Sequence, residues 1–280
     1  MMRQVVDAYG DRVLLGEIYL PVDKLVTYYG SDEGAELHLP INLNLSWLAW
    51  EANTLIAAIE TYDQQLPEHA WPIWLMSTHD SSRLATRAGD EGARVAAMLL
   101  MTLRGTPILY YGEEIGMHDA PVPPERARDP QGQRTIRSRD PERTPMQWDH
   151  SLQAGFTSGE PCLPIGPDYE TVNGTALRDD PHSLLTLYRR LMSLRQNEPA
   201  LVRGGSVPLP RQAPFMAYRR DSDNRRLLIL LNLGPEPLTF NIADQGGQGR
   251  ILLSTYLDRE GEEVQEEVKF RGFEGVIWAL

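Results

Sequence analysis

The first 115 residues alternate short apolar runs with longer segments in which apolar residues recur at helical spacing. The apolar runs lie at 12–19, 36–45, 73–76 and 106–111, and helical patterns lie at 47–65 and 90–104. Runs that are almost continuously apolar are typical of strands buried on both faces, and strands that alternate with helices form parallel sheets. The pattern therefore predicts an α/β fold built from βα units.

The chain changes character near residue 205. Before that point lie a stretch rich in Pro, Gly, Arg and Asp (112–180) and an amphipathic helical pattern (183–197). After it come short apolar runs separated by turn sequences such as DSDN and GPEP, a spacing typical of a small antiparallel sandwich or barrel. We therefore expect two domains, residues 1–205 and 206–280. An irregular stretch as long as 112–180 is usually functional or disordered.

Charge and cysteine content narrow the range of functions. The formal net charge is −12, which disfavours binding to nucleic acid and to anionic membranes. No apolar stretch approaches the roughly 20 residues of a transmembrane helix, and the N-terminus lacks the apolar core of a signal peptide, so we expect a cytoplasmic protein. Cys162 is the single cysteine, which excludes an internal disulfide and a cysteine-based zinc site.

Polar residues follow three of the four apolar runs. Glu17 follows the first, His79 and Asp80 follow the third, and Glu113 and Glu114 follow the fourth. Chemistry in parallel α/β folds gathers at the carboxyl ends of strands, and two carboxylates on different strands suit acid–base catalysis. The alternative is that polar residues end these runs only because loops begin there. Neighbours on an extended segment point to opposite faces, so Glu113 and Glu114 are not expected to share one role.

The most distinctive string of the irregular stretch is RDPERTPMQWD, residues 139–149. Its arginines and tryptophan suit the clamping of a sugar by bidentate hydrogen bonds and stacking, although a solvated charged loop is the alternative. We interpret Trp148 as a packing residue of this loop, and Trp47 and Trp74 as core. Neither a H-E-x-x-H string nor a glycine-rich phosphate cradle occurs, so the sequence predicts no metal and no cofactor.

Seven strings together resemble the α-amylase superfamily, within it the α-glucosidase and oligo-1,6-glucosidase branch. They occur in the family's order, and YYGEEIGM and RTPMQWD are the most specific parts. The strings are LLGEIYLP (14–21), HLPINLNL (38–45), THDSSRLATR (78–87), GTPILYYGEEIGM (105–117), SRDPERTPMQWD (138–149), GFTSGEPCLPI (155–165) and SLLTLYRRLMSLR (183–195).

The resemblance implies a (β/α)8 TIM barrel that hydrolyses α-linked gluco-oligosaccharides with retention. It implies that Glu17 is the general acid/base and that Asp80 is the carboxylate that fixes the substrate and stabilises the transition state. His79 is similar to the family histidine that hydrogen-bonds the sugar in the subsite of cleavage. Either Arg139 or Arg143 resembles the arginine that orients this glucose.

Two strings of the family, D-x-x-x-N-H and G-F-R-x-D, do not occur in these 280 residues, and the second carries the family's nucleophile. The resemblance therefore implies the C-terminal half of the barrel followed by a small all-β domain. Retaining hydrolysis needs two carboxyl groups about 5–5.5 Å apart, so we expect the chain alone to be inactive. Half a barrel exposes unpaired strand edges, so we expect a homodimer or binding to the missing N-terminal half-barrel.

Two other interpretations stay open. The first is a non-catalytic carbohydrate-binding or scaffold derivative of the family, which would bind saccharides without turnover. The second is a transglycosylating relative, such as a trehalose or sucrose-isomer synthase, which product analysis on maltose and sucrose would identify.

Overall fold

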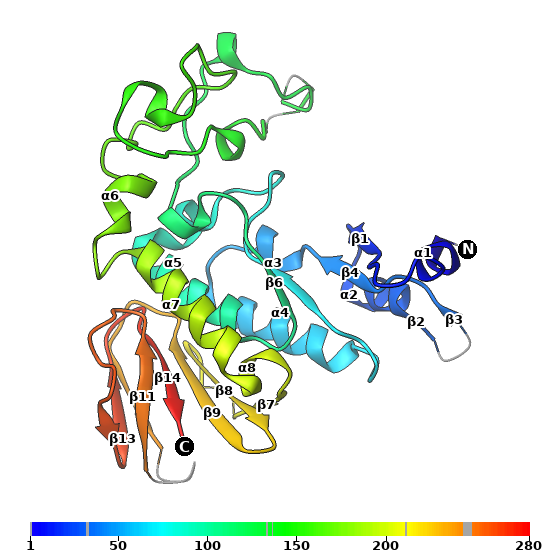
Figure 1. The fold of residues 1–280 in the computed structure, drawn as a ribbon, viewed down its shortest axis with the longest axis vertical. Coiled ribbons are helices and arrows are strands. Elements are labelled where there is room, and N and C mark those ends of the chain that lie inside the picture. The colour runs from blue at the N-terminus through cyan, green and yellow to red at the C-terminus, as the bar shows by residue number, and fades with distance from the viewer. Residues whose placement is uncertain (1, 32–33, 133, 136, 211, 243–247) are drawn as a thin grey trace.

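The computed structural model describes residues 2–31, 34–132, 134–135, 137–210, 212–242 and 248–280. Its N-terminal part holds two parallel strand pairs. Strand β1 (Leu15–Ile18) pairs with β4 (Leu39–Asn42), and β5 (Ile73–Leu75) pairs with β6 (Thr106–Ile108). Since β4 also lies beside β5, the four strands follow one another in the order β1, β4, β5, β6 (Figure 1). The predicted parallel arrangement of these runs is confirmed.

Three long helices accompany these strands. They are α4 (Ala52–Gln65), α5 (Leu84–Thr102) and α7 (Leu184–Asn197). Helix α4 begins after Glu51, whose carboxylate accepts hydrogen bonds from two backbone N–H groups of the first turn, and the Ser183 hydroxyl caps α7 by accepting from the Thr186 N–H. The segment assigned to α5 starts six residues before the predicted pattern, and Gly89, at φ 72°, interrupts its helical geometry.

The shorter elements connect these strands and helices. The helices are α1 (Met2–Asp7), α2 (Val22–Leu25), α3 (Asn44–Trp47), α6 (Gly174–Arg178) and α8 (Pro199–Val202). Two strands of two residues each, β2 (Gly30–Ser31) and β3 (Gly34–Ala35), pair in antiparallel fashion. The 3-10 turns are η1 (Val26–Tyr29), η2 (Glu113–Ile115), η3 (Pro124–Arg126), η4 (Pro141–Arg143) and η5 (Leu152–Gly155). Among the described helices, none combines the length and the apolar character that a membrane crossing requires.

The C-terminal part is antiparallel. A six-stranded sheet has the order β12-β11-β14-β9-β8-β7, and β10 pairs with β13 in a second, two-stranded sheet. The bounds are β7 (Gly205–Pro208), β8 (Phe215–Ser222), β9 (Arg225–Asn232), β10 (Leu238–Asn241), β11 (Gly249–Ser254), β12 (Glu263–Val264), β13 (Glu267–Phe270) and β14 (Gly275–Ala279). An apolar cluster that includes Phe240, Phe270 and Trp278 joins residues of both sheets. The antiparallel prediction is therefore confirmed for these strands.

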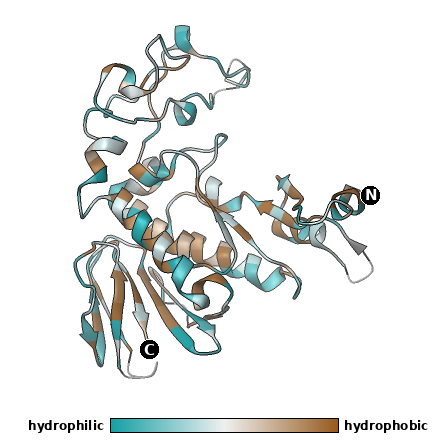
Figure 2. Cartoon of the chain, in the orientation of Figure 1, coloured by the Kyte–Doolittle hydropathy of each residue, from teal (hydrophilic) through white to brown (hydrophobic). Residues whose placement is uncertain are grey.

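The two parts share one hydrophobic core. Helices α5 and α7 lie side by side against the large sheet, and one apolar cluster includes residues of α4, α5, α7, β8, β9 and β14 (Figures 1 and 2). Polar contacts cross the same junction: Trp50 Nε1 donates to the Leu233 carbonyl at 3.1 Å, and Arg94 Nε donates to the Thr255 carbonyl at 2.8 Å. The predicted boundary at residue 205 falls at the start of β7 and stays a prediction.

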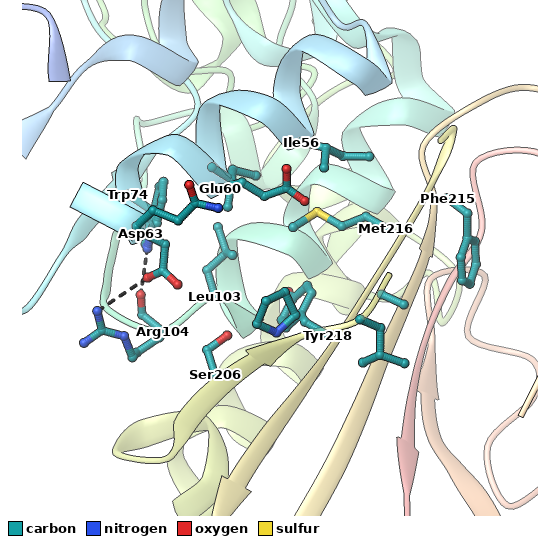
Figure 3. Close-up of a pocket in the computed structure, with 15 residues that line it drawn as sticks. Ile56, Glu60, Asp63, Trp74, Leu103, Arg104, Ser206, Phe215, Met216 and Tyr218 are labelled. Carbon is teal, nitrogen blue, oxygen red and sulfur yellow. Dashed lines mark hydrogen bonds and ion pairs between the residues drawn. The ribbon is translucent and has the colours of Figure 1, made fainter. Parts of the chain in front are cut away.

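A small pocket of about 70 Å³ marks this junction where α4 faces β7 and β8 (Figure 3). Ile56 of α4, Leu103 directly after α5 and Met216 of β8 line this pocket. The ion pair of Asp63 with Arg104 lines it as well. Trp74 is buried here, as predicted. Trp47 is not core: it ends α3 with 44% of its surface exposed, and its ring packs under the Arg137 guanidinium instead.

Candidate active site

The carboxyl ends of β1 and β5 bring three of the predicted site residues together. Glu17 lies on β1 with its side chain exposed, and His79 and Asp80 lie in the turn that follows β5. Each residue offers one oxygen or nitrogen atom, and these atoms lie within 4.8 Å of one another. The turn is fixed from within, because the Asp80 N–H donates to Thr78 Oγ1 at 3.1 Å.

Hydrogen bonds engage both oxygens of Asp80. Oδ1 accepts from Arg139 Nη1 at 2.9 Å and from Arg143 Nη2 at 2.6 Å, and Oδ2 accepts from the Tyr19 hydroxyl at 2.8 Å. Burial raises the pKa of Asp80, but the Tyr19 hydrogen bond and the charges of His79 and Arg139 outweigh burial and lower the pKa below its ordinary value. Asp80 is therefore held as a carboxylate. The pKa of the Tyr19 hydroxyl rises, through burial first and then through its bond to Asp80.

A second carboxylate, Asp129, fixes Arg139 in the site. The Asp129 side chain is fully buried, and its oxygens accept from Arg139 Nε at 3.0 Å, from Nη2 at 2.7 Å and from the Arg139 backbone N–H at 2.8 Å. These bonds lower the pKa of Asp129 and raise that of Arg139. Arg143 is fixed differently, since its Nε donates to the His79 carbonyl at 2.7 Å. The sequence left the choice between the two arginines open, and the structure places both on Asp80.

Sequence reasoning missed Tyr19 and Asp129. Tyr19 lies two residues beyond Glu17, and side chains at that spacing on an extended chain share one face, so its proximity was predictable from strand period. No sequence pattern pointed to Asp129. Asp129 and its partner Arg139 lie in an irregular loop, where no helical or strand periodicity predicts which residues are neighbours.

Glu113 is not part of the cluster of Glu17, His79 and Asp80. It begins the turn η2 instead of continuing the strand, and it is buried with its Oε1 accepting from the Tyr188 hydroxyl at 2.9 Å. Burial raises the pKa of Glu113 to about 7, against weaker lowering by Tyr188, Ser77 and Arg87. Its Oε2 has no hydrogen-bond partner among the described residues. The extended geometry expected for this pair of glutamates is therefore wrong.

The cluster of Glu17, His79 and Asp80 also has the composition of a cation site. Arg139 and Arg143 already lie on the Asp80 oxygen, so an incoming cation meets two positive charges at a few ångströms. An imidazole, two carboxylates and two guanidinium groups in this arrangement instead suit the hydroxyl groups of a polar, uncharged ligand.

The chain belongs to the alpha-amylase catalytic-domain family, whose model matches residues 1–204. It is 36% identical over 275 residues to the amino acid transporter heavy chain SLC3A1 of Homo sapiens, covering 94% of this chain and 39% of that protein. It is 30% identical over 260 residues to the probable oligo-1,6-glucosidase 2 of Bacillus subtilis (strain 168), covering 82% of this chain and 46% of that protein. The crystal structure of the alpha-glucosyl transfer enzyme XgtA superposes with a TM-score of 0.88 at 28% identity, over 99% of this chain and 52% of that one.

These comparisons confirm the resemblance that the motifs indicated. They also show that the chain spans less than half the length of these two curated relatives.

Proposed function

We propose that this chain is the part of a retaining α-glucosidase-type glycoside hydrolase that carries the acid/base, Glu17, and the transition-state-stabilising carboxylate, Asp80. The observation that carries the proposal is the convergence of Glu17, His79 and Asp80 within 4.8 Å at the ends of two parallel strands. Relatives named as a glucosidase and a glucosyl transfer enzyme support this class of reaction. The proposed substrates are α-linked gluco-oligosaccharides.

In the proposed reaction Glu17 gives its proton to the glycosidic oxygen as the bond to C1 breaks, and later accepts a proton from the attacking water. His79 donates a hydrogen bond to a sugar hydroxyl. Asp80 stays ionised and stabilises the positive charge that develops on the sugar ring. Its low pKa, with Tyr19 and Arg139 as partners, supports this role.

The nucleophile in this proposal comes from outside these 280 residues. Asp80 is not available for that role, because Arg139 and Arg143 engage one of its oxygens and Tyr19 engages the other. Without a second free carboxylate no covalent glycosyl intermediate forms. The chain alone is therefore inactive in our proposal.

An assay with p-nitrophenyl α-glucoside tests this. We expect only background turnover by the chain alone, and turnover once it is fused to the preceding half of the oligo-1,6-glucosidase relative. Glu17→Gln in the fusion should remove that turnover, while Glu36→Gln, an exposed glutamate outside the site, should not. Turnover by the unfused chain that Glu17→Gln abolishes would refute the external nucleophile, and a fusion that is folded but inactive would refute the roles of Glu17 and Asp80.

We also propose that residues 1–205 form half of a (β/α)8 barrel, with residues 206–280 as its β domain, and that a second copy or an N-terminal half-barrel covers its free edge. Strand β1 pairs on one side only among the described residues, and Val13 and Leu15 there are 55% and 51% exposed. Exposed apolar edge strands invite pairing with another chain. Light scattering should find a homodimer that Leu15→Lys dissociates; a monodisperse monomer at high concentration would contradict self-association.

A non-catalytic scaffold is the second candidate function. It is favoured by the 36% identity to a protein named as an amino acid transporter heavy chain. Saccharide binding by a stable dimer, with no turnover even in the fusion, would favour this candidate over the hydrolase.

Transglycosylation is a variant of the first candidate, supported by the likeness to the glucosyl transfer enzyme. Product analysis of the fusion on maltose and sucrose separates the two, since hydrolysis yields free monosaccharides and transfer yields new disaccharides.

A further inference from the structure

The long loop between β6 and α7 encloses a pocket that is separate from the site around Asp80. Its volume is about 610 Å³, within the 300–1,000 Å³ of small-molecule sites. Glu17, His79 and Asp80 do not line it, whereas Arg143, which contacts Asp80, and Asp129, which holds Arg139, line this pocket as well. We call it the loop pocket.

Three aromatic rings line the loop pocket, and each is partly open to solvent. Trp148 is 54% exposed, Phe156 48% and Tyr111 38%. The expectation that Trp148 packs inside the loop is therefore wrong. Exposed aromatic rings that face one pocket offer flat apolar surfaces to a ligand.

The backbone holds these rings in place although the rings themselves are exposed. The Trp148 N–H donates to the Ala154 carbonyl at 2.9 Å, and its carbonyl accepts from the Thr175 N–H at 2.9 Å. Gln153 and Ala154, just before Phe156, have φ of 57° and 52°, a left-handed conformation that residues other than glycine adopt only where the surrounding structure imposes it. The Tyr111 hydroxyl donates to the Thr144 carbonyl at 2.6 Å. The rings are therefore presented by a fixed frame rather than by a loose loop.

Charged side chains also line the loop pocket, among them those of Arg128, Glu114 and Asp129. The Arg128 side chain is exposed and makes no hydrogen bond or ion pair with the part of the chain that the structure describes, while its backbone N–H is held by Asp140 at 2.8 Å. Glu114, which is half-buried, also lines the pocket. A free guanidinium and a carboxyl suit vicinal hydroxyl groups, and aromatic faces suit the C–H faces of a sugar ring.

We propose that the loop pocket is a second carbohydrate-binding site, distinct from the site at Glu17 and Asp80, in which a glucosyl unit stacks on Trp148 and Phe156 and hydrogen-bonds to Arg128. This inference does not depend on catalysis by Glu17. It assigns the loop a binding function whether the chain works as a hydrolase or as a scaffold.

Titration of the full chain with maltose tests the proposal. Calorimetry measures the affinity, and NMR spectra report which of the six tryptophan indole N–H signals shift. The background variant is Asp80→Asn, which removes sugar recognition at the Glu17–Asp80 site. In that background we expect maltose to shift the Trp148 signal and to bind. Adding Trp148→Ala should weaken binding about tenfold, the factor for about 1.4 kcal/mol of lost stacking, and Trp148→Phe should restore part of it.

Trp47→Ala is the matched control, because Trp47 is similarly exposed but lies outside the loop pocket, and we expect it to leave maltose affinity unchanged. Glycerol controls for nonspecific polyol binding and should not shift the Trp148 signal. Maltose affinity that is unaffected by Trp148→Ala and Phe156→Ala, or no binding in the Asp80→Asn background, overturns the proposal. Failure of the glucosidase assay leaves these outcomes unchanged, so the two proposals are tested separately.

Discussion

Glu113 should make the stability of this protein fall as the pH rises from about 4.5 to 7. Its pKa in the folded chain is about 7, against an ordinary value of 4.5, because burial penalises the ionised form. Between these two values the folded state keeps a proton that the unfolded state has lost, so unfolding becomes easier with each pH step. The difference of 2.5 units corresponds to about 3 kcal/mol at about 1.4 kcal/mol per unit.

Glu113→Gln removes this titration while keeping an oxygen that accepts from Tyr188. We expect the variant to match the wild type near pH 4.5 and to exceed its free energy of unfolding by up to about 3 kcal/mol at pH 8. Urea denaturation at a series of pH values measures this difference. Glu125→Gln, at an exposed glutamate of η3, is the control. If the curves of Glu113→Gln and the wild type stay parallel from pH 4.5 to 8, Glu113 is not the titrating group and the reasoning fails.

Three other perturbations have defined outcomes. Asp129→Asn should lower the free energy of unfolding by about 2 kcal/mol, because it weakens the charge-assisted hydrogen bonds between this buried carboxylate and the half-buried Arg139, and a loss below about 0.5 kcal/mol in urea denaturation would contradict that. Tyr19→Phe removes the hydroxyl that donates to Asp80, so the pKa of Asp80 should rise, and a carboxyl NMR titration that shows no rise would exclude Tyr19 as a cause. Gly204→Ala should be clearly less stable in thermal unfolding than Gly205→Ala, because an added Cβ at Gly204 meets two backbone oxygens and one at Gly205 meets nothing; equal stability would contradict the close approach.

The parallel strands were predictable because they come from almost continuously apolar runs, although among the four strands only β5 is buried along its whole length. The strand runs at 73–76 and 106–111 correspond to β5 and β6, and Asp80 and Glu113 lie in the segments that follow these strands. The start of α5 was not predictable from the helical spacing of apolar residues. Gly89 interrupts the helical geometry and separates Leu84 from the regularly spaced apolar residues that follow Gly89. Trp47 was predicted to lie in the core because it is a large apolar residue. Helix α3 ends at this residue, however, and the Trp47 ring lies at the surface.

The candidate site was predictable only where regular elements position it. Glu17 lies near the end of β1 and Asp80 follows β5, so strand order alone brings them to one edge. Arg139 and Arg143, which bind Asp80, come from an irregular loop. Hydrogen bonds rather than a periodic spacing of residues set the geometry of this loop, as in the bond from Arg139 to Asp129, ten positions earlier. Whether one or both arginines reach Asp80 depends on how that loop folds back, and residue type alone does not decide it.

The hydrophobic core that joins the helices to the large sheet limits which segments of this chain can be exchanged for those of a relative by recombination. Residues of α5 and α7 belong to the same apolar cluster as residues of β8 and β9, so exchanging the segment after residue 205 for that of a relative replaces one side of this contact and leaves the other unchanged. Such a hybrid keeps its stability only when both sides change together, as at the contact of Thr102 Oγ1 with the Tyr218 hydroxyl at 2.5 Å. The C-terminal strands and the helices thus form one matched core, and the strands are not an interchangeable module.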